Sequence, residues 1–306
     1  MDYSKKCLKR FKKNLIMKKK LLKNAKKIDQ FLIRFLKKQK NSLLVKPMKY
    51  GVISGGKKIR STIILDAGKI FNINPKKLIN ICAAVECIHS YSLIHDDLPS
   101  MDNDPIRRGK PSTHIKFGEA SAILAGSSLL TLAFEIIADK KYLLNLKSKN
   151  EIIKSLASCS GHTGIAGGQE LDLKFENEKK NLNQIIDMQK KKTGKLFHFC
   201  LYAVGTVANQ NRKKIFFLSK LGEEIGLLFQ LADDLLDFKG SRKLLGKPVK
   251  KDYKKGKSTL LSLMGEKKAY LYANNLKKKI LLKLEKHGKK ARELINTIEF
   301  ILERKF

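Results

Sequence analysis

The sequence predicts an all-α protein built as one large helical bundle. Three segments place apolar residues about 3.6 positions apart, at 78–97, 119–139 and 216–238. Each is long enough for about five or six helical turns and is apolar around much of its circumference, which is typical of helices in the middle of a bundle. No segment alternates apolar and polar residues over the length of a strand, so we predict no β-strand.

Glycine- and proline-containing segments interrupt this helical pattern. They lie at 55–58, 98–111, 161–169 and 238–248. None has the composition of a linker between domains, and we find no internal repeat. We therefore expect a single domain over residues 31–306, preceded by a basic helical segment over residues 1–30.

The composition is that of a soluble globular protein. With 42% hydrophobic residues, the 306-residue chain can bury a large core. No apolar stretch reaches the roughly 18 residues that a membrane span needs. The five cysteines form no CxxC pair and no secretory signal is present, which favours reduced thiols in the cytoplasm over disulfides or a zinc site.

The chain is strongly basic, with 65 Lys and Arg residues against 28 Asp and Glu, a net charge of +37. Such a charge suggests nucleic acid or an acidic membrane as a partner. Only nine of these cations are Arg, however, and the 56 Lys are spread along the whole chain. Proteins that bind nucleic acids usually concentrate Arg and interleave aromatic residues. We favour Lys-rich solvated helix faces, and keep a basic nucleic-acid-binding helical protein as the alternative from a different class.

The first thirty residues place four apolar side chains at helical spacing among many lysines: Leu8, Phe11, Leu15 and Leu22. A basic amphipathic helix can lie on an anionic membrane, and it can also be a targeting segment. Transit peptides favour Arg and Ser and avoid acids, whereas this segment has one Arg and one Ser and carries Asp2 and Asp29. We therefore favour a first helix that packs on the body of the protein over one that contacts a membrane.

Two acidic clusters stand out, and each follows an apolar helix. They are Asp96, Asp97, Asp102 and Asp104 in the first, and Asp233, Asp234 and Asp237 in the second. On a helix, Asp233 and Asp237 share one face because residues four apart are neighbours, while Asp234 lies about 100° away. One cluster alone would be explained as a solvated helix cap, but two such clusters indicate a shared chemical purpose.

The loop of the first cluster can bring two carboxylates together. Pro99 cannot continue a helix interior, so the loop can turn Asp102 back toward Asp96. Adjacent carboxylates raise one another's pKa unless a cation lies between them. Oxygen ligands without His or Cys suit Mg²⁺, which takes one or two carboxylates together with water and substrate phosphate. The two clusters predict a diphosphate held by Mg²⁺ between two helix ends.

Basic residues near these clusters fit the same hypothesis. The segment GGKKIR (55–60) supplies Lys57, Lys58 and Arg60 after two glycines that allow close backbone approach. Arg107 and Arg108 follow the first cluster, and an Arg guanidinium matches a phosphate with two parallel hydrogen bonds. Later cations are Lys192 beside Thr193, then Lys247 and Lys257.

At these residues the sequence resembles the trans-prenyl diphosphate synthases, and among them the bacterial farnesyl diphosphate synthases. The resemblance is carried, in the family's order, by GGKKIR (55–60), AAVECIHSYSLIHDDLPSMDNDPIRRGKPSTH (83–114), GGQELD (167–172), KKTG (191–194), FQLADDLLD (229–237), LGKP (245–248) and GKST (256–259). It implies the isoprenoid synthase fold, an all-α bundle around a deep central apolar cavity, and a homodimer.

The resemblance also implies the reaction. Isopentenyl diphosphate would condense head to tail with allylic diphosphates (dimethylallyl and geranyl) to give farnesyl diphosphate, with Mg²⁺ as cofactor. Metal ions and cations would stabilise the leaving diphosphate so that the allylic C–O bond ionises. An apolar cavity would keep water from the carbocation. The double bond of isopentenyl diphosphate would attack the carbocation, and a proton would then leave to the departed diphosphate.

Each site residue receives a role from the resemblance. Three Mg²⁺ would be bound by Asp96, Asp102 and Asp233, with support from Asp97, Asp234 and Asp237. The allylic diphosphate would be contacted by Arg107, Lys192 and Lys247. The diphosphate of isopentenyl diphosphate would be bound by Lys57, Arg60, His89 and Arg108. Oxygens for the developing cation would come from Thr193 and Gln230, which with Lys192 form the catalytic set, and Lys257 would be a further substrate-binding residue.

Histidines on apolar helices are more often core residues than ligands. His89, however, lies about two turns before Asp97 inside the long matched segment, so we assign it to substrate binding. We interpret His95 and His114 as structural or supporting residues.

Product length follows from two side chains that precede the first cluster. Tyr91 and Ser92 lie five and four residues before Asp96, about one helical turn deeper. A ring at Tyr91 would close the tunnel into which the growing tail extends, as in the bacterial farnesyl type. Geranyl and geranylgeranyl diphosphate synthases of the same family stay open as alternatives.

The sequence departs from the family pattern at several positions, without losing a metal ligand. These are Lys58 and Ser61 in the first motif, Ser127 where Asp is usual, Ser241 and Leu260. They bear on catalytic efficiency and stability. A terpene cyclase would generally replace the second aspartate cluster, and a non-catalytic subunit of a heteromeric synthase would have lost aspartates from these motifs.

Overall fold

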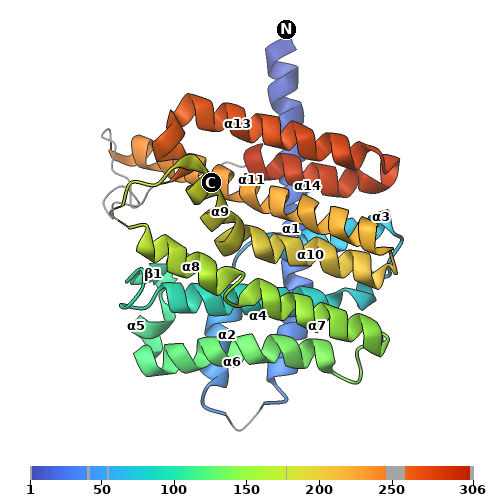
Figure 1. Ribbon diagram of the computed structural model, residues 1–306, viewed down its shortest axis with the longest axis vertical. Coiled ribbons are helices and arrows are strands. Elements are labelled where there is room, and N and C mark those ends of the chain that lie inside the picture. The colour runs from blue at the N-terminus through green and yellow to red at the C-terminus, as the bar shows by residue number, and fades with distance from the viewer. Residues whose placement is uncertain (1, 40–41, 54, 177, 246–258, 304–306) are drawn as a thin grey trace. The chain divides into compact units, whose positions relative to one another are not determined.

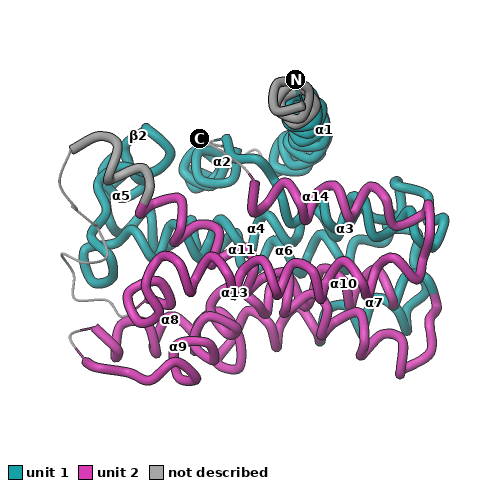
Figure 2. Tube along the Cα trace, turned by 90° about the horizontal axis from the view of Figure 1, so that it is seen from above, with its two compact units in different colours: residues 1–154, 206–208 teal, residues 155–205, 209–306 magenta. Residues whose placement is uncertain are grey.

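The computed structural model describes residues 2–39, 42–53, 55–176, 178–245 and 259–303, with side chains described for all of these except 2–11 and 239–245. Over these residues the chain is almost entirely helical (Figure 1), which confirms the all-α prediction. Its packing defines two compact units, coloured separately in Figure 2. Unit 1 comprises residues 1–154 and 206–208, and unit 2 comprises residues 155–205 and 209–306.

Unit 1 is built around α4 (Ile79–Asp96), which buries every residue from Asn80 to Ile88. Four helices pack against α4, namely α1 (Asp2–Leu36), α2 (Val45–Ile53), α3 (Ile59–Ile70) and α6 (Glu119–Ala138). The remaining helical elements are η1 (Pro75–Lys77), α5 (Thr113–Phe117) and the first part of α7 (Leu146–Ser160). Helices α1 and α2 cross α4 and α6 at a steep angle (Figure 1).

Unit 2 is built around α11 (Arg212–Leu245), which packs against α9 (Leu182–Gln189), α13 (Leu260–Glu285) and α14 (Arg292–Glu303). A π-helical turn, η2 (Lys190–Gly194), joins α9 directly to α10 (Lys195–Val207). The other elements are α8 (Ile165–Lys174) and η3 (Gly288–Ala291).

The three predicted helices are confirmed as α4, α6 and α11, with differences at their ends. Helix α11 runs on to Leu245 instead of ending at residue 238, because a single interior glycine, here Gly240, costs a helix only about 1 kcal/mol. Helix α8 begins at Ile165, inside the segment 161–169 that we expected to be a break. Helix α1 passes residue 30 without interruption, and the division there stays a prediction, as does the central cavity.

The prediction of no strand is wrong for one short hairpin, in which β1 (Ile106–Arg107) pairs antiparallel with β2 (Lys110–Pro111). Its two turn residues, Arg108 and Gly109, have φ angles of 53° and 73°. A two-residue hairpin turn of type I′ requires positive φ at both positions. Strands of two residues are too short to show alternation, so the sequence carries almost no signal for them.

Helix α6 is long and apolar enough, by length and composition, to cross a membrane. By helix length and hydropathy, α6 therefore contradicts our expectation that no apolar segment is long enough to span a membrane. However, 44% of its most apolar window is buried, and α6 packs on α4 and α5 within unit 1. We interpret α6 as a core helix, since the core helices of soluble proteins have the same properties.

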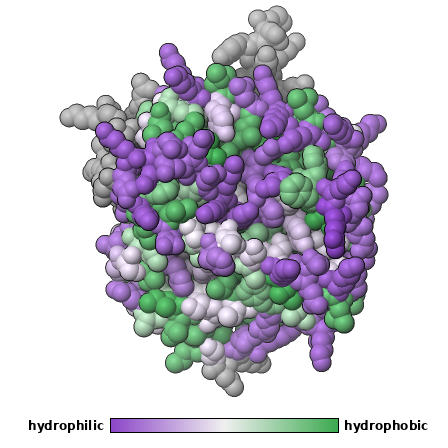
Figure 3. Space-filling model, in the orientation of Figure 1, coloured by the Kyte–Doolittle hydropathy of each residue, from purple (hydrophilic) through white to green (hydrophobic). Residues whose placement is uncertain are grey.

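Hydrophilic side chains cover much of the face seen in Figure 3, with hydrophobic ones scattered among them. This distribution agrees with the interpretation of the many lysines as solvated helix faces.

Candidate active site

The acidic loop after α4 turns back onto the end of its own helix. The backbone N–H of Asp102 donates to the carbonyl oxygen of Asp96 at 2.8 Å, and that of Asp104 donates to the carbonyl oxygen of Asp97 at 3.1 Å. These bonds hold the Asp102 backbone beside the end of α4. The turn predicted from Pro99 is confirmed.

Asp96 and Asp97 point to different faces, because consecutive helical residues differ by about 100°. Asp96 is half-buried and lies on the same face of α4 as His89 and Ser92, seven and four residues earlier. Asp97 caps the end of α4 and is buried. The two carboxylates therefore have different surroundings.

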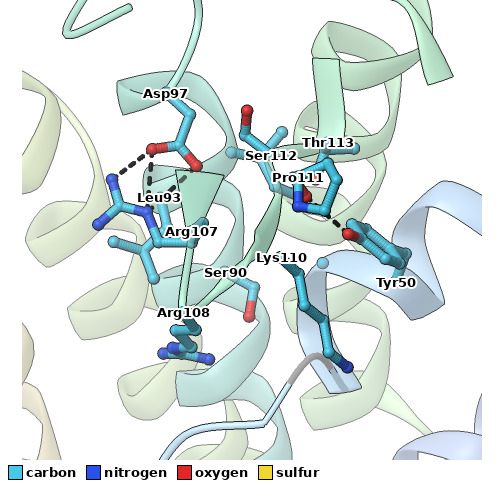
Figure 4. Close-up of a pocket in the computed structure, with 12 residues that line it drawn as sticks. Tyr50, Ser90, Leu93, Asp97, Arg107, Arg108, Lys110, Pro111, Ser112 and Thr113 are labelled. Carbon is cyan, nitrogen blue, oxygen red and sulfur yellow. Dashed lines mark hydrogen bonds and ion pairs between the residues drawn. The ribbon is translucent and has the colours of Figure 1, made fainter. Parts of the chain in front are cut away.

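Asp97 is paired with Arg107 of strand β1 (Figure 4). Nε of Arg107 donates to Oδ1 and Oδ2 of Asp97 at 2.9 and 3.2 Å, and Nη2 also donates to Oδ1. Burial raises the pKa of Asp97, against the hydrogen bond and positive charge of Arg107. The pair fixes the guanidinium of Arg107 at the end of α4, and the supporting metal role of Asp97 stays a prediction.

A small pocket lies beside this pair and is lined by residues of α2, α4 and the hairpin (Figure 4). Its volume of about 20 Å³ suits roughly one water molecule. The hydroxyl of Tyr50 donates to the carbonyl oxygen of Pro111 at 2.6 Å, which fastens the hairpin to α2. The pocket is too small for a prenyl diphosphate, and the ion pair of Asp97 with Arg107 lies in its wall.

Arg108, at the hairpin turn, lies against the glycine-rich loop before α3. Its Nη1 donates to the carbonyl oxygen of Gly55 at 2.6 Å. Gly56 has a φ of 103°, and a Cβ at that position would lie 2.7 Å from the Arg108 guanidinium. The positive φ favours glycine here, and any side chain at this position would displace the Arg108 guanidinium. The structure thus brings together two motifs that are some fifty residues apart in the sequence.

His89 lies within the field of the same cations. Burial, followed by the charges of Arg60, Arg108 and Lys58, holds the pKa of His89 well below its usual range. The neutral ring keeps one N–H donor, so His89 can donate to a phosphate oxygen without carrying a charge. Lys57 is half-buried in the adjacent loop. The structure therefore groups Arg60, His89 and Arg108, as their predicted role requires.

Lys58 makes its contacts inside unit 1. Its Nζ donates to the carbonyl oxygen of Val52 at 2.6 Å and lies 3.6 Å from Asp29 and 3.8 Å from Glu86. Oγ of Ser61 donates to Oε1 of Glu86 at 2.7 Å. Two departures from the family pattern, Lys58 and Ser61, thus meet in one buried network. Glu86 is a supporting residue that the sequence analysis missed, and its only signal was its place in the motif AAVECIH.

Tyr91 is buried on α4 and is held by the packing of α4 on α6. Its ring meets that of His95 edge-on, with centroids 5.5 Å apart. Nε2 of His95 donates to the carbonyl oxygen of Ile123 at 3.1 Å, and a Cβ at Gly126 would lie 2.3 Å from that nitrogen. His95 is therefore a structural residue that helps to fix the Tyr91 ring.

The other two residues assigned near this helix end make local contacts. Oγ of Ser92 donates to the carbonyl oxygen of His89 at 3.0 Å. His114 is buried, with Nδ1 3.2 Å from Oγ of Ser112, which is consistent with a structural role.

The second acidic cluster lies on α11 in unit 2. Asp233 is half-buried and Asp237 is exposed, and their spacing puts both on one face. Asp234 is buried and accepts a hydrogen bond from Nε2 of Gln230 at 2.9 Å. Oε1 of Gln230 accepts a hydrogen bond from Oγ1 of Thr193 at 3.0 Å. The structure thus brings together Thr193 and Gln230, two of the predicted catalytic residues.

Lys192 and Thr193 lie in the π turn η2, an irregularity that is frequent at functional sites. Nζ of Lys192 donates to Oδ2 of Asp172 on α8 at 2.7 Å. A Cβ at Gly168 would lie 2.2 Å from the backbone nitrogen of Lys192, so glycine is needed where α8 approaches η2. Asp172 is a second supporting residue that the sequence analysis missed, although it closes the motif GGQELD.

Lys247 and Lys257 lie outside the described residues, and the side chain of Ser241 is not described either. Ser127 donates from Oγ to the carbonyl oxygen of Ile123 on the exposed side of α6, and Leu260 is buried.

Among the described residues, no three Asp, Glu, His or Cys side chains gather closely enough to hold a metal ion by themselves. Mg²⁺ does not need such a cluster, because it is bound through one or two carboxylates together with substrate phosphates and water. Asp96 with Asp102 in unit 1, and Asp233 with Asp237 in unit 2, each offer carboxylate oxygens only. The donor chemistry of both clusters therefore fits Mg²⁺.

Known proteins with similar sequences cover most of this chain. The family model described as polyprenyl synthetase matches residues 41–298. The farnesyl diphosphate synthase of Escherichia coli (strain K12) is 41% identical over 256 residues, which cover 82% of this chain and 86% of that protein. The farnesyl diphosphate synthase of Bacillus subtilis (strain 168) is 39% identical, with 82% of each protein covered.

Solved structures agree with this relationship. An FPP/GFPP synthase from Zymomonas mobilis is 35% identical, with a TM-score of 0.82 and coverage of 94% of this chain and 99% of that chain. A geranyltransferase from Helicobacter pylori, complexed with magnesium and isoprenyl diphosphate, is 30% identical, with a TM-score of 0.76 and coverage of 94% and 96%. The chain, matched from residue 41 to residue 298, belongs to the polyprenyl synthetase family.

Proposed function

We propose that this chain is a prenyltransferase that elongates allylic diphosphates with isopentenyl diphosphate, and that its main product is farnesyl diphosphate. One observation carries the proposal. His89, which lies among Arg60, Arg108 and Lys58, shares a face of α4 with the carboxylate of Asp96, about 10 Å along the helix. A reaction between two diphosphates needs a cationic site for one of them and a metal-binding carboxylate for the other. One face of α4 offers both.

Magnesium would be held by the two acidic clusters, with Asp96, Asp102 and Asp233 as ligands of three ions and Asp97, Asp234 and Asp237 in support. When bound, it supplies positive charge that stabilises the departing diphosphate. Supporting this assignment are the all-oxygen donors of each cluster and the Helicobacter pylori relative, which is complexed with magnesium.

The chain's own residues would bind and orient the two substrates. Arg107, which is fixed by Asp97, would bind the allylic diphosphate together with Lys192 and Lys247. Isopentenyl diphosphate would be held by Lys57, Arg60, His89 and Arg108, and Lys257 would contribute a further cation. The oxygens of Thr193 and Gln230 would face the allylic cation, where a preorganised dipole lowers the barrier without reorganising.

Product length would be set by Tyr91 and Ser92. Support comes from the rigid packing of the Tyr91 ring against His95 and from the farnesyl diphosphate synthases among the relatives. A geranyl or geranylgeranyl product is the alternative within the same family.

The enzyme would act as a cytoplasmic homodimer. Helix α6 exposes the large apolar side chains of Ile123 and Leu124, which a second copy could cover. Light scattering coupled to size exclusion tests this state, and a monomer at micromolar concentration would contradict it.

The experiment that tests the function is one incubation of the purified protein with Mg²⁺, dimethylallyl diphosphate and isopentenyl diphosphate, with products separated by chain length. We expect mainly the C15 product, and none when a chelator removes Mg²⁺. A C10 or C20 product would retain the reaction and overturn the product assignment. No condensation, together with salt-dependent binding of any DNA or RNA, would favour the nucleic-acid alternative.

A further inference from the structure

Helix α1 has two faces of different character. On one face Met17, Leu21, Ile28 and Leu32 are buried in unit 1. On the opposite face three large apolar side chains are exposed, with Leu15 at 46%, Ile16 at 67% and Leu22 at 69% of their full accessible area. Figure 2 shows α1 at the margin of unit 1. Exposed apolar residues are ordinary when scattered singly, but a group on one short stretch of helix indicates a contact surface.

Helical geometry joins these three side chains into one surface. Leu15 and Leu22 are seven residues apart and point in nearly the same direction, with Ile16 about 100° from Leu15. Four exposed lysines lie on the same side of the helix: Lys12, Lys19, Lys23 and Lys26. Residues 12–28 contain eight Lys and no Asp or Glu. We call this surface, Leu15, Ile16 and Leu22 with the four lysines, the basic apolar face of α1.

Side-chain contacts fix the direction in which this face points. Nζ of Lys20 donates to the buried carboxylate of Asp66 on α3 at 2.6 Å. Nδ2 of Asn24 donates to Oγ1 of Thr62 at 3.2 Å. These bonds hold one side of α1 on α3, so the basic apolar face is presented outward without any rearrangement of unit 1.

We propose that the basic apolar face of α1 binds the surface of an anionic lipid bilayer. Leu and Ile side chains can enter the boundary between headgroups and acyl chains, while the flexible lysine stems let the ammonium groups stay among the headgroup phosphates. The charge of the face is complementary to anionic lipid, and each lysine near such a surface adds attraction. The protein is thereby a peripheral membrane protein, attached through one helix outside the substrate-binding residues.

The same face is poorly suited to nucleic acid. Residues 12–28 contain no Arg and no aromatic residue, whereas proteins that bind single strands stack bases on aromatic rings or guanidinium planes. Leu15, Ile16 and Leu22 would gain nothing against a phosphate backbone. Lipid is the partner that uses both the charge and the apolar side chains.

The chain contains no Trp, which allows a direct test of insertion. In Leu22→Trp the new indole is the only Trp in the protein. Its emission should shift to shorter wavelength on vesicles that contain about 30% anionic lipid, and stay unchanged on vesicles of zwitterionic lipid alone. The matched control is Leu271→Trp on α13, where the native side chain is 61% exposed; its emission should not shift. A shift in the control alone, or in neither variant, overturns the proposal.

A second measurement uses vesicle co-sedimentation of the full chain. Leu15→Asn combined with Leu22→Asn should weaken binding to anionic vesicles by about tenfold or more, and Leu271→Asn combined with Leu282→Asn should not. Binding should also fall when ionic strength rises to about 0.5 M, because salt screens the lysines. Equal binding by both double variants would show that net charge alone attracts the protein and would overturn the proposed face. None of these readouts depends on prenyl transfer, so they fail or succeed independently of the proposed reaction.

Discussion

Thr193 in the π turn donates a hydrogen bond from Oγ1 to Oε1 of Gln230 on α11, over 3.0 Å. Nε2 of Gln230 in turn donates to Asp234, so both ends of the amide are oriented. A carbonyl oxygen has two lone pairs, and Oε1 can accept this bond while presenting its negative charge to a developing cation.

Replacing Thr193 tests this arrangement. In Thr193→Val the donor is lost and the amide oxygen of the half-buried Gln230 loses its partner, so we expect kcat to fall by about 10- to 100-fold. Thr193→Ser keeps the hydroxyl and should stay within a few-fold of the wild type. Steady-state kinetics at saturating substrates measures both, and an equal loss in the two variants would count against a role for the hydroxyl.

Replacing Asp96 or Asp233 by Asn tests the metal assignment. Each change would remove a charged oxygen from the proposed magnesium site, and we expect kcat/KM to fall by about 10³-fold or more, since charge stabilisation at the leaving group is a large catalytic effect. Asp187→Asn on α9, an exposed position, is the matched control and should be nearly neutral. If both clusters act on one diphosphate, the double variant Asp96→Asn with Asp233→Asn should lose less kcat/KM than the product of the two single losses. A loss equal to that product would show that the two clusters act separately.

The chain length of the product tests the proposal that Tyr91 limits it. Tyr91→Ala should move the main product from C15 toward C20, because removing the ring leaves room for a longer tail. Tyr91→Phe should retain C15. Chromatography of the products distinguishes these outcomes, with Tyr270→Ala, an exposed ring on α13, as a control for loss of aromatic residues elsewhere. An unchanged distribution of products in Tyr91→Ala would show that Tyr91 does not limit product length.

The lowered pKa of His89 predicts that the folded protein loses stability as the pH falls. Its pKa is lowered in the folded protein, so below about pH 6.5 the unfolded chain binds a proton that the folded chain does not. Stability contributed by the neutral ring is full above pH 6.5 and is lost as the pH falls, with a slope approaching about 1.4 kcal/mol per pH unit. Urea unfolding of wild type and His89→Gln should therefore give free energies that change relative to one another below pH 6.5, with the wild type losing more. Parallel curves would mean that His89 is protonated in the folded state.

The parts of this protein that depend on local pattern were predictable. Apolar periodicity located α4, α6 and α11, and the spacing of Asp233 and Asp237 placed both on one face. The return of the loop to Asp96 followed from Pro99, because a proline removes a helical hydrogen bond and disfavours continuation of the helix.

Pairings across long stretches of sequence were not predictable. Lys192 is one of 56 lysines, and nothing near it in the sequence indicates that its partner is Asp172. Ser61 and Glu86 are likewise joined only because α3 and α4 pack together. A single sequence records which residue types are present, whereas these contacts depend on how the helices are arranged.

The π turn η2 has one more consequence. A π turn holds one residue more than an α turn, so Lys190–Gly194 amounts to a one-residue insertion absorbed inside a continuous rod. If the same five residues wound as a regular α-helix, the chain after the turn, all of α10 included, would be rotated by about 100° relative to α9. The side chains of α10 would then face elsewhere although every residue was still present, which makes helical phase as much a property of this unit as side-chain identity.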